Sequence, residues 1–159
     1  GYKRKTHGLT NSVEYVAWQH MIRRCNVPTM PNFRIYGGRG IKVCDRWMGE
    51  DGFINFLNDM GKRPEKGYSL DRIDNDKGYY PDNCRWANRQ IQSINQSVRL
   101  GSSSGVRGVS YHKTSGKWYA QIGINHKKVS LGYYVNIDDA ISARKAAEEK
   151  YFKPILDKA

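Results

Sequence analysis

The sequence predicts an α+β protein made of two small domains. Polar and apolar residues alternate over 68–73, turn formers follow over 74–78, and apolar residues recur at helical spacing over 87–98. This pattern predicts a strand, a loop, a second short strand near 83–86 and a helix. Regular turn signals over 105–134 predict a small three-stranded antiparallel sheet packed on one helix.

A Gly/Ser-rich stretch suggests where the two domains meet. Residues 99–104 have the composition of a flexible linker. We therefore expect a first domain over 1–98 with its core at 67–98, a hinge over 99–104 and a second domain over 105–159. A chain of 159 residues can hold two such domains, each with a thin core.

Two helices are expected before the core of the first domain. Residues 1–10 are basic and polar and should form a loose arm. A helix should begin near Ser12, because Asn11 and Glu14 have the spacing of a capping pair. A second helix is expected over 51–60. The apolar residues of the first helix fall on one face, as core packing requires: Tyr15, Trp18, Met21, Ile22 and Cys25.

The glycine-rich segment over 36–40 precedes strand-like residues and lacks the phosphate-loop pattern. We expect its glycines to permit a tight turn rather than to bind a nucleotide. Arg39 within it would be free to meet a DNA backbone.

Acid and amide residues gather in the predicted core. The first strand would deliver Asp71 to the place where the helix delivers Gln92 or Asn95, and a hard cation prefers oxygen ligands of this kind. The alternative is that residues 71–76 form only a charged turn.

The order of these residues resembles the HNH endonuclease family, and phage proteins with GGRGI, SLDRIDN and NCRWA segments form a branch of it. The resemblance implies a ββα-metal nuclease core preceded by helices. By position, Asp71 and Gln92 would hold Mg²⁺ or another divalent ion, and Asn83 would tie the loop to the strand. Arg72 stands where the family has its general-base His, and could grip the scissile phosphate instead. The implied catalytic residues are Asp71, Arg72, Asn83 and Gln92, with Arg85 among the DNA-binding residues.

The second domain is similar to the Apetala-two and ethylene-response-factor DNA-binding domains. The matching segments are GVRGV at 105–109, Lys117-Trp118, Leu131-Gly132 and the alanine-rich helix over 137–152. The resemblance implies that one face of the sheet enters the major groove of DNA. By position, the residues facing DNA would be Arg107, Tyr111, Trp118 and Gln121, with Lys113, Lys117, Lys127 and Lys128 nearer the phosphates. The alternative for Trp118 is packing in the core.

Charge supports a nucleic-acid partner. The net charge is +12, and residues 99–137 contain six basic residues, several aromatic residues and no acid. This composition is expected of a nucleic-acid surface, although a merely soluble basic domain is the alternative. No apolar run is long enough to span a membrane, and the first residues lack the apolar core of a signal peptide.

The cysteine content favours a reducing compartment. Cys25, Cys44 and Cys84 are odd in number and form no Cys-x-x-Cys pair. We expect buried thiols rather than disulfides or a zinc site, which would need a fourth ligand such as His20.

Together these patterns predict a sequence-directed, homing-like DNA endonuclease or nickase. It would act on double-stranded DNA in a bacterial cytoplasm, as a bacterial or phage protein, and either a monomer or a dimer is compatible with the sequence. The alternative is a DNA-binding regulator whose nuclease core has decayed, and an RNA-binding protein is a third interpretation.

Overall fold

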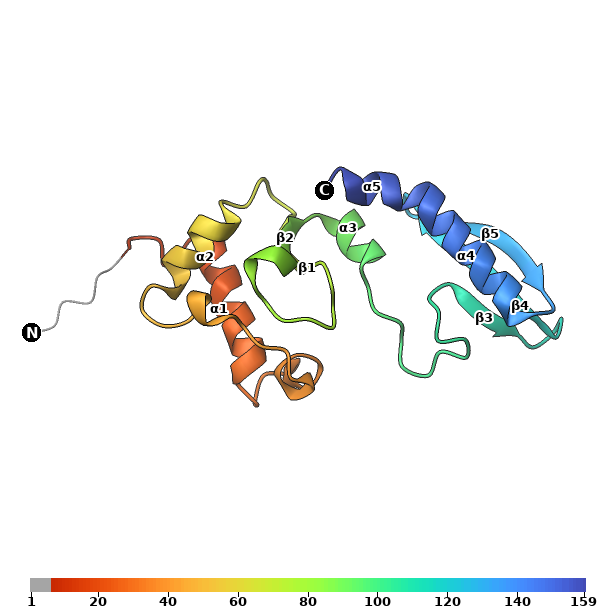
Figure 1. Ribbon diagram of the computed structural model, residues 1–159, viewed down its shortest axis with the longest axis horizontal. Helices are drawn as coiled ribbons and strands as arrows, with labels where there is room; N and C mark the ends of the chain where they lie inside the picture. The colour runs from red at the N-terminus through yellow and green to blue at the C-terminus, as the bar shows by residue number, and fades with distance from the viewer. Residues whose placement is uncertain (1–6) are drawn as a thin grey trace, which may run out of the picture. The chain divides into compact units, whose positions relative to one another are not determined.

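The computed structural model describes residues 7–159 (Figure 1). Residues 1–6, the first part of the predicted basic arm, lie outside the described residues. The mixed α+β class is confirmed. The chain divides into two compact units, the first ending at Arg89 and the second beginning at Gln90. The predicted domains at 1–98 and 105–159 stay a prediction.

The first unit contains helices α1 (Val13–Asn26) and α2 (Gly52–Met60). The N-cap of α1 is Ser12, whose Oγ accepts a hydrogen bond from the backbone N–H of Tyr15 at 3.1 Å. The cap therefore lies one residue later than the predicted Asn11, because the Ser hydroxyl satisfies an N–H of the first turn.

Short 3₁₀ helices link these elements: η1 (Phe33–Ile35), η2 (Gly37–Arg39), η3 (Asp45–Trp47) and η4 (Pro81–Asn83). Gly40 ends η2 in the left-handed region with φ of 85°. A Cβ at Gly37 would overlap the carbonyl oxygen of Cys25 in α1. The glycine-rich segment is therefore a tight turn pressed against a helix. The strand-like residues after it make only the isolated bridge between Val43 and Tyr79.

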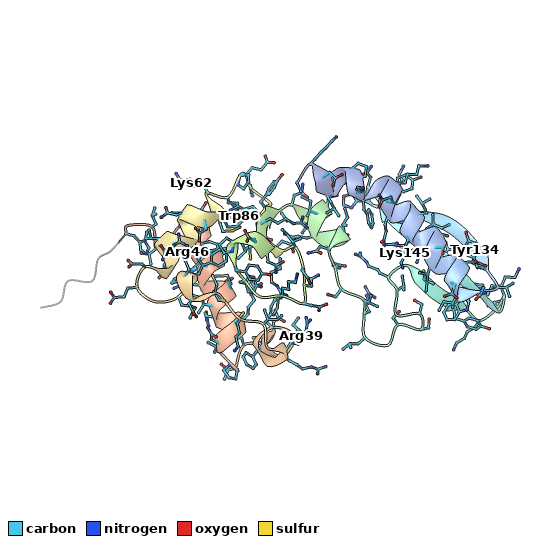
Figure 2. The ribbon with its side chains drawn as sticks, in the orientation of Figure 1. Arg39, Arg46, Lys62, Trp86, Tyr134 and Lys145 are labelled. Atoms are coloured by element: carbon cyan, nitrogen blue, oxygen red, sulfur yellow. The ribbon has the colours of Figure 1, made fainter. Side chains whose placement is uncertain are left out.

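Strands β1 (Ser69–Arg72) and β2 (Cys84–Ala87) form an antiparallel pair in the first unit. Asp71 lies opposite Arg85 in this register. Trp86, labelled in Figure 2, donates from its indole Nε1 to the carbonyl oxygens at the end of α2. The buried core around this pair consists of Met21, Cys25, Ile41, Val43, Trp47, Phe53, Phe56, Tyr79 and Cys84.

The second unit is a meander sheet in the order β3-β4-β5, with helix α4 along one of its faces (Figure 1). Its elements are β3 (Val109–His112), β4 (Lys117–Ile124), β5 (Lys127–Tyr134), α4 (Ile137–Tyr151) and α5 (Lys153–Asp157). Val109, Ala120 and Ala140 are buried together between sheet and helix.

Helix α3 (Arg89–Ile94) starts at the boundary and is shorter than the predicted 87–98. Its last residue, Ile94, packs against the buried cluster of Ile122, Ala147 and Phe152 in the second unit. The end of this helix therefore contributes to the core of the second unit.

Strand alternation gives the sheet two distinct faces. Ala120 and Ile122 are fully buried on the face that packs on α4. Tyr119, before Ala120, and Gln121, between Ala120 and Ile122, therefore point away from α4. The pairing places Tyr133 opposite Tyr119 and Ser130 opposite Gln121, on that same outward side. We call the side away from α4 the outward face.

Within residues 7–159, none of the helices combines the length and the apolar character that crossing a membrane requires.

Candidate functional site

The loop between β1 and β2 is held by the side chain of Asn83. This residue is 4% exposed. Its Oδ1 accepts from the backbone N–H of Asp74 at 2.9 Å, and its Nδ2 donates to the carbonyls of Asp74 at 3.1 Å and Gly78 at 2.8 Å. One buried amide thus fastens both ends of the loop, as the resemblance implies for this position. Its importance for catalysis stays a prediction.

Arg72 supports the same loop from its other side. Its side chain is buried, and Nη1 donates to the carbonyl oxygens of Asn75 at 2.9 Å and Lys77 at 2.7 Å. The guanidinium carbon lies 5.2 Å from the ring centroid of Tyr36 and 5.0 Å from that of Tyr79. Carbonyl dipoles and ring faces stabilise the buried positive charge. In this geometry the guanidinium of Arg72 is hydrogen-bonded to the loop backbone. Binding of a phosphate by Arg72 stays a prediction.

A second arginine completes the cluster around the two rings. Arg24 of α1 lies 5.0 Å from the ring centroid of Tyr36, and its Nη1 donates to the hydroxyl of Tyr79 at 3.3 Å. Burial raises the pKa of Tyr79 to about 12, so the phenol stays neutral. Arg24 and Tyr36 come from segments distant from Arg72 and Tyr79 in the sequence, so sequence reasoning did not find the cluster.

Asp71 and Arg85 form a cross-strand ion pair beside this loop. Nε of Arg85 lies 3.3 Å from Oδ2 of Asp71, and the two side chains are 19% and 16% exposed. The structure therefore brings together the predicted metal-binding acid and a predicted DNA-binding arginine. A phosphate approaching the carboxylate would meet a guanidinium that can donate to it.

Asp71 belongs to the first unit and Gln92 to the second, so their joint binding of one ion stays a prediction. No group of three or more His, Cys, Asp and Glu side chains that could hold a metal occurs within residues 7–159. A carboxylate and an amide oxygen nevertheless suit Mg²⁺, which usually takes one or two carboxylates and fills its remaining positions with water and substrate phosphates.

Arg39 lies at the surface next to the loop. Its Nη2 is 2.6 Å from Oδ1 of Asp76, and the two side chains are 41% and 86% exposed. Such an exposed pair contributes little stability, so a phosphate can compete for the guanidinium.

Asp74 within the loop accepts a hydrogen bond from the backbone N–H of Asp76, which lowers the pKa of the Asp74 carboxyl group.

The predicted DNA-facing residues of the second unit divide between the two faces. Gln121 lies on the outward face, whereas Tyr111 and Trp118 pair with each other on the face toward α4. Trp118 packs against the core, which was the alternative for this residue. Arg107 donates to the carbonyl oxygens of Ser93 and Ile94 at the end of α3, and burial lowers its pKa.

The predicted phosphate-contacting lysines are all exposed: Lys113, Lys117, Lys127 and Lys128. On the outward face the sequence reasoning missed Tyr119, Tyr133 and His112, whose rings touch in a row. The signal that could have identified Tyr119 is its place directly before Ala120, because a small residue suits the packed face of the sheet and its strand neighbour then lies on the other face.

Comparisons of the chain with protein families, curated proteins and solved structures gave no match.

Proposed function

We propose that this protein is a sequence-directed, homing-like DNA endonuclease or nickase that hydrolyses a phosphodiester bond with one divalent metal ion. The first unit would carry the chemistry, and the second would bind double-stranded DNA. The observation that carries this proposal is the loop that Asn83 and Arg72 fasten between β1 and β2. That loop starts directly after the strand on which Asp71 faces Arg85.

The role of each residue follows from its chemistry. Asp71 would hold the ion, most simply Mg²⁺, which stabilises negative charge on a scissile phosphate when bound. Arg85 would donate to a phosphate oxygen beside Asp71. A guanidinium group has only N–H donors and no acceptor, so Arg72 cannot act as the base that takes a proton from water. Its contribution is to keep the loop, and with it the end of β1, in place.

Plasmid relaxation tests the proposal. Supercoiled plasmid incubated with the protein and Mg²⁺ or Mn²⁺ should yield nicked or linear product, whereas a parallel reaction with EDTA should yield none. The proposal fails if neither metal supports cleavage while the protein still binds the plasmid.

That failure would favour a second candidate function, a DNA-binding regulator with a decayed nuclease core. The observation that favours the regulator is that Arg72 donates to carbonyl oxygens of the loop. The position where the HNH family has its general base would then hold a residue with a purely structural role.

A further inference from the structure

The outward face of the second unit carries a row of aromatic rings. The ring centroids of Tyr119 and Tyr133 lie 4.8 Å apart with an interplanar angle of 35°. His112 continues the row, its centroid 5.2 Å from that of Tyr133. The three residues come from β4, β5 and β3, so every strand of the sheet contributes a ring. Tyr133 is 50% exposed, so part of its ring is open to a ligand.

The charges of the second unit are separated between the two sides of the sheet. Lys117 and Lys128 are exposed and share the outward face with the rings, by the strand pairing. The strands contain no Asp or Glu. The acids of this unit all lie in the helical layer, on α4 and α5: Asp138, Asp139, Glu148, Glu149 and Asp157. An aromatic row with a basic border and no acid fits a polyanion that also has flat apolar groups.

The side chains on this face suit base faces better than base edges. Reading an intact groove requires paired donors and acceptors, which Arg, Lys, Asn and Gln supply. Gln121 is available for this on the outward face, but the guanidinium of Arg107 is engaged with the carbonyls of α3. Stacked neighbours cover the faces of bases inside a duplex. Unpaired bases expose their faces, and aromatic side chains bind them by stacking.

We propose that the outward face binds unpaired bases of single-stranded DNA, which stack on Tyr133 and Tyr119 while Lys117 and Lys128 contact the phosphates. This inference rests on the proposed function for the identity of the partner and specifies the state of its strands. Binding then takes place where the duplex is locally opened.

Fluorescence anisotropy of the full-length protein in EDTA, which prevents cleavage, tests this inference. Three labelled probes of equal length are compared: an oligothymidine strand, an abasic strand with the same number of phosphates, and a duplex. The thymidine strand should bind at least tenfold more tightly than the abasic strand. Tyr133→Ala should weaken thymidine binding about 5- to 100-fold, from the stacking lost per base, and leave abasic binding unchanged.

Two variants serve as controls. Tyr133→Phe keeps the ring and should keep the affinity. Tyr111→Ala removes a tyrosine of similar exposure, 46%, from the opposite face and should leave the preference for the thymidine strand over the abasic strand unchanged. The inference is overturned if the abasic strand binds as tightly as the thymidine strand, or if Tyr133→Ala and Tyr111→Ala lose affinity alike. If the protein binds the thymidine strand as described but never nicks plasmid, the endonuclease function is rejected and the single-strand binding inference stands.

Discussion

At the residue scale, the loop between β1 and β2 depends on two buried polar side chains. Asn83 and Arg72 together bond to the backbone of Asp74, Asn75, Lys77 and Gly78. A buried polar group stabilises a fold only when it is bonded, and removing one partner leaves others unsatisfied. The loop geometry should therefore respond strongly to conservative changes at these two positions.

Arg72→Lys tests the structural role of the buried guanidinium. An ammonium keeps the charge but cannot reproduce the planar contacts with two carbonyls and two rings. The free energy of unfolding, measured by urea denaturation, should fall by about 2–3 kcal/mol. Arg39→Lys, in an exposed ion pair, should change it by less than about 0.5 kcal/mol. If both variants were equally stable, Arg72 would not have the structural role proposed for it.

Cys84 gives the fold a dependence on alkaline pH. Burial raises the pKa of its thiol to about 12, whereas an unfolded chain ionises near pH 8.5. The unfolded state therefore binds fewer protons than the folded state above pH 8.5, and stability falls as pH rises toward 12. One such group gives a slope of about 1.4 kcal/mol per pH unit.

Urea denaturation under reducing conditions at pH 8, 9 and 10 measures this slope. Cys84→Ala is less stable overall because it leaves a cavity, but its stability should decline less steeply with pH than that of the native chain. Identical slopes would show that Cys84 ionises as readily in the folded protein as in the unfolded one.

At the element scale, the close approach of the loop to the residues after η2 requires a glycine. The N–H of Tyr79 donates to the carbonyl oxygen of Lys42 at 2.8 Å, and a Cβ at Gly78 would lie 2.5 Å from that oxygen. Gly78→Ala should lower the free energy of unfolding by about 1–3 kcal/mol through this overlap. Gly123→Ala, where no atom lies within 4 Å of the added Cβ, is the matched control. Thermal or urea unfolding of both variants measures the difference. Equal stability would mean that the backbone accommodates the added Cβ without a loss of free energy.

The sequence predicted the elements better than their ends and faces. Turn residues at regular spacing predicted three strands within 105–134, and β3, β4 and β5 lie there. The helical spacing that extends to Val98 did not reveal that α3 ends at Ile94. Arg107 donates to two of the last carbonyls of the helix, a contact from outside the helix that its spacing does not indicate.

Site residues were predictable where a motif carried them and not where the fold brought them together. Asn83 stood in a recognisable segment, and its hydrogen bonds tie the loop. The sequence could not place Trp118 on the core side, because an aromatic residue in a strand suits either face until the register is known. The row formed by Tyr119, Tyr133 and His112 likewise depends on that register.

At the scale of the whole molecule, the two units have different roles in the proposed function. The first would supply the carboxylate of Asp71, and the second would supply the basic and aromatic surface that holds DNA. Binding through lysines and arginines weakens with salt, by a slope of about −0.9 for each neutralised phosphate. A change confined to Asp71 should leave that slope unaltered.

The most direct test of the proposed function measures both plasmid nicking and DNA binding by Asp71→Ala. Nicking of supercoiled plasmid in Mg²⁺ should fall by roughly 100-fold or more, because metal-assisted charge stabilisation amounts to several kcal/mol. DNA affinity in EDTA should stay within roughly threefold of the native chain, since phosphate contacts come from other side chains. Asp82→Ala, an exposed acid before β2, should change neither activity. Full nicking by Asp71→Ala would contradict the account.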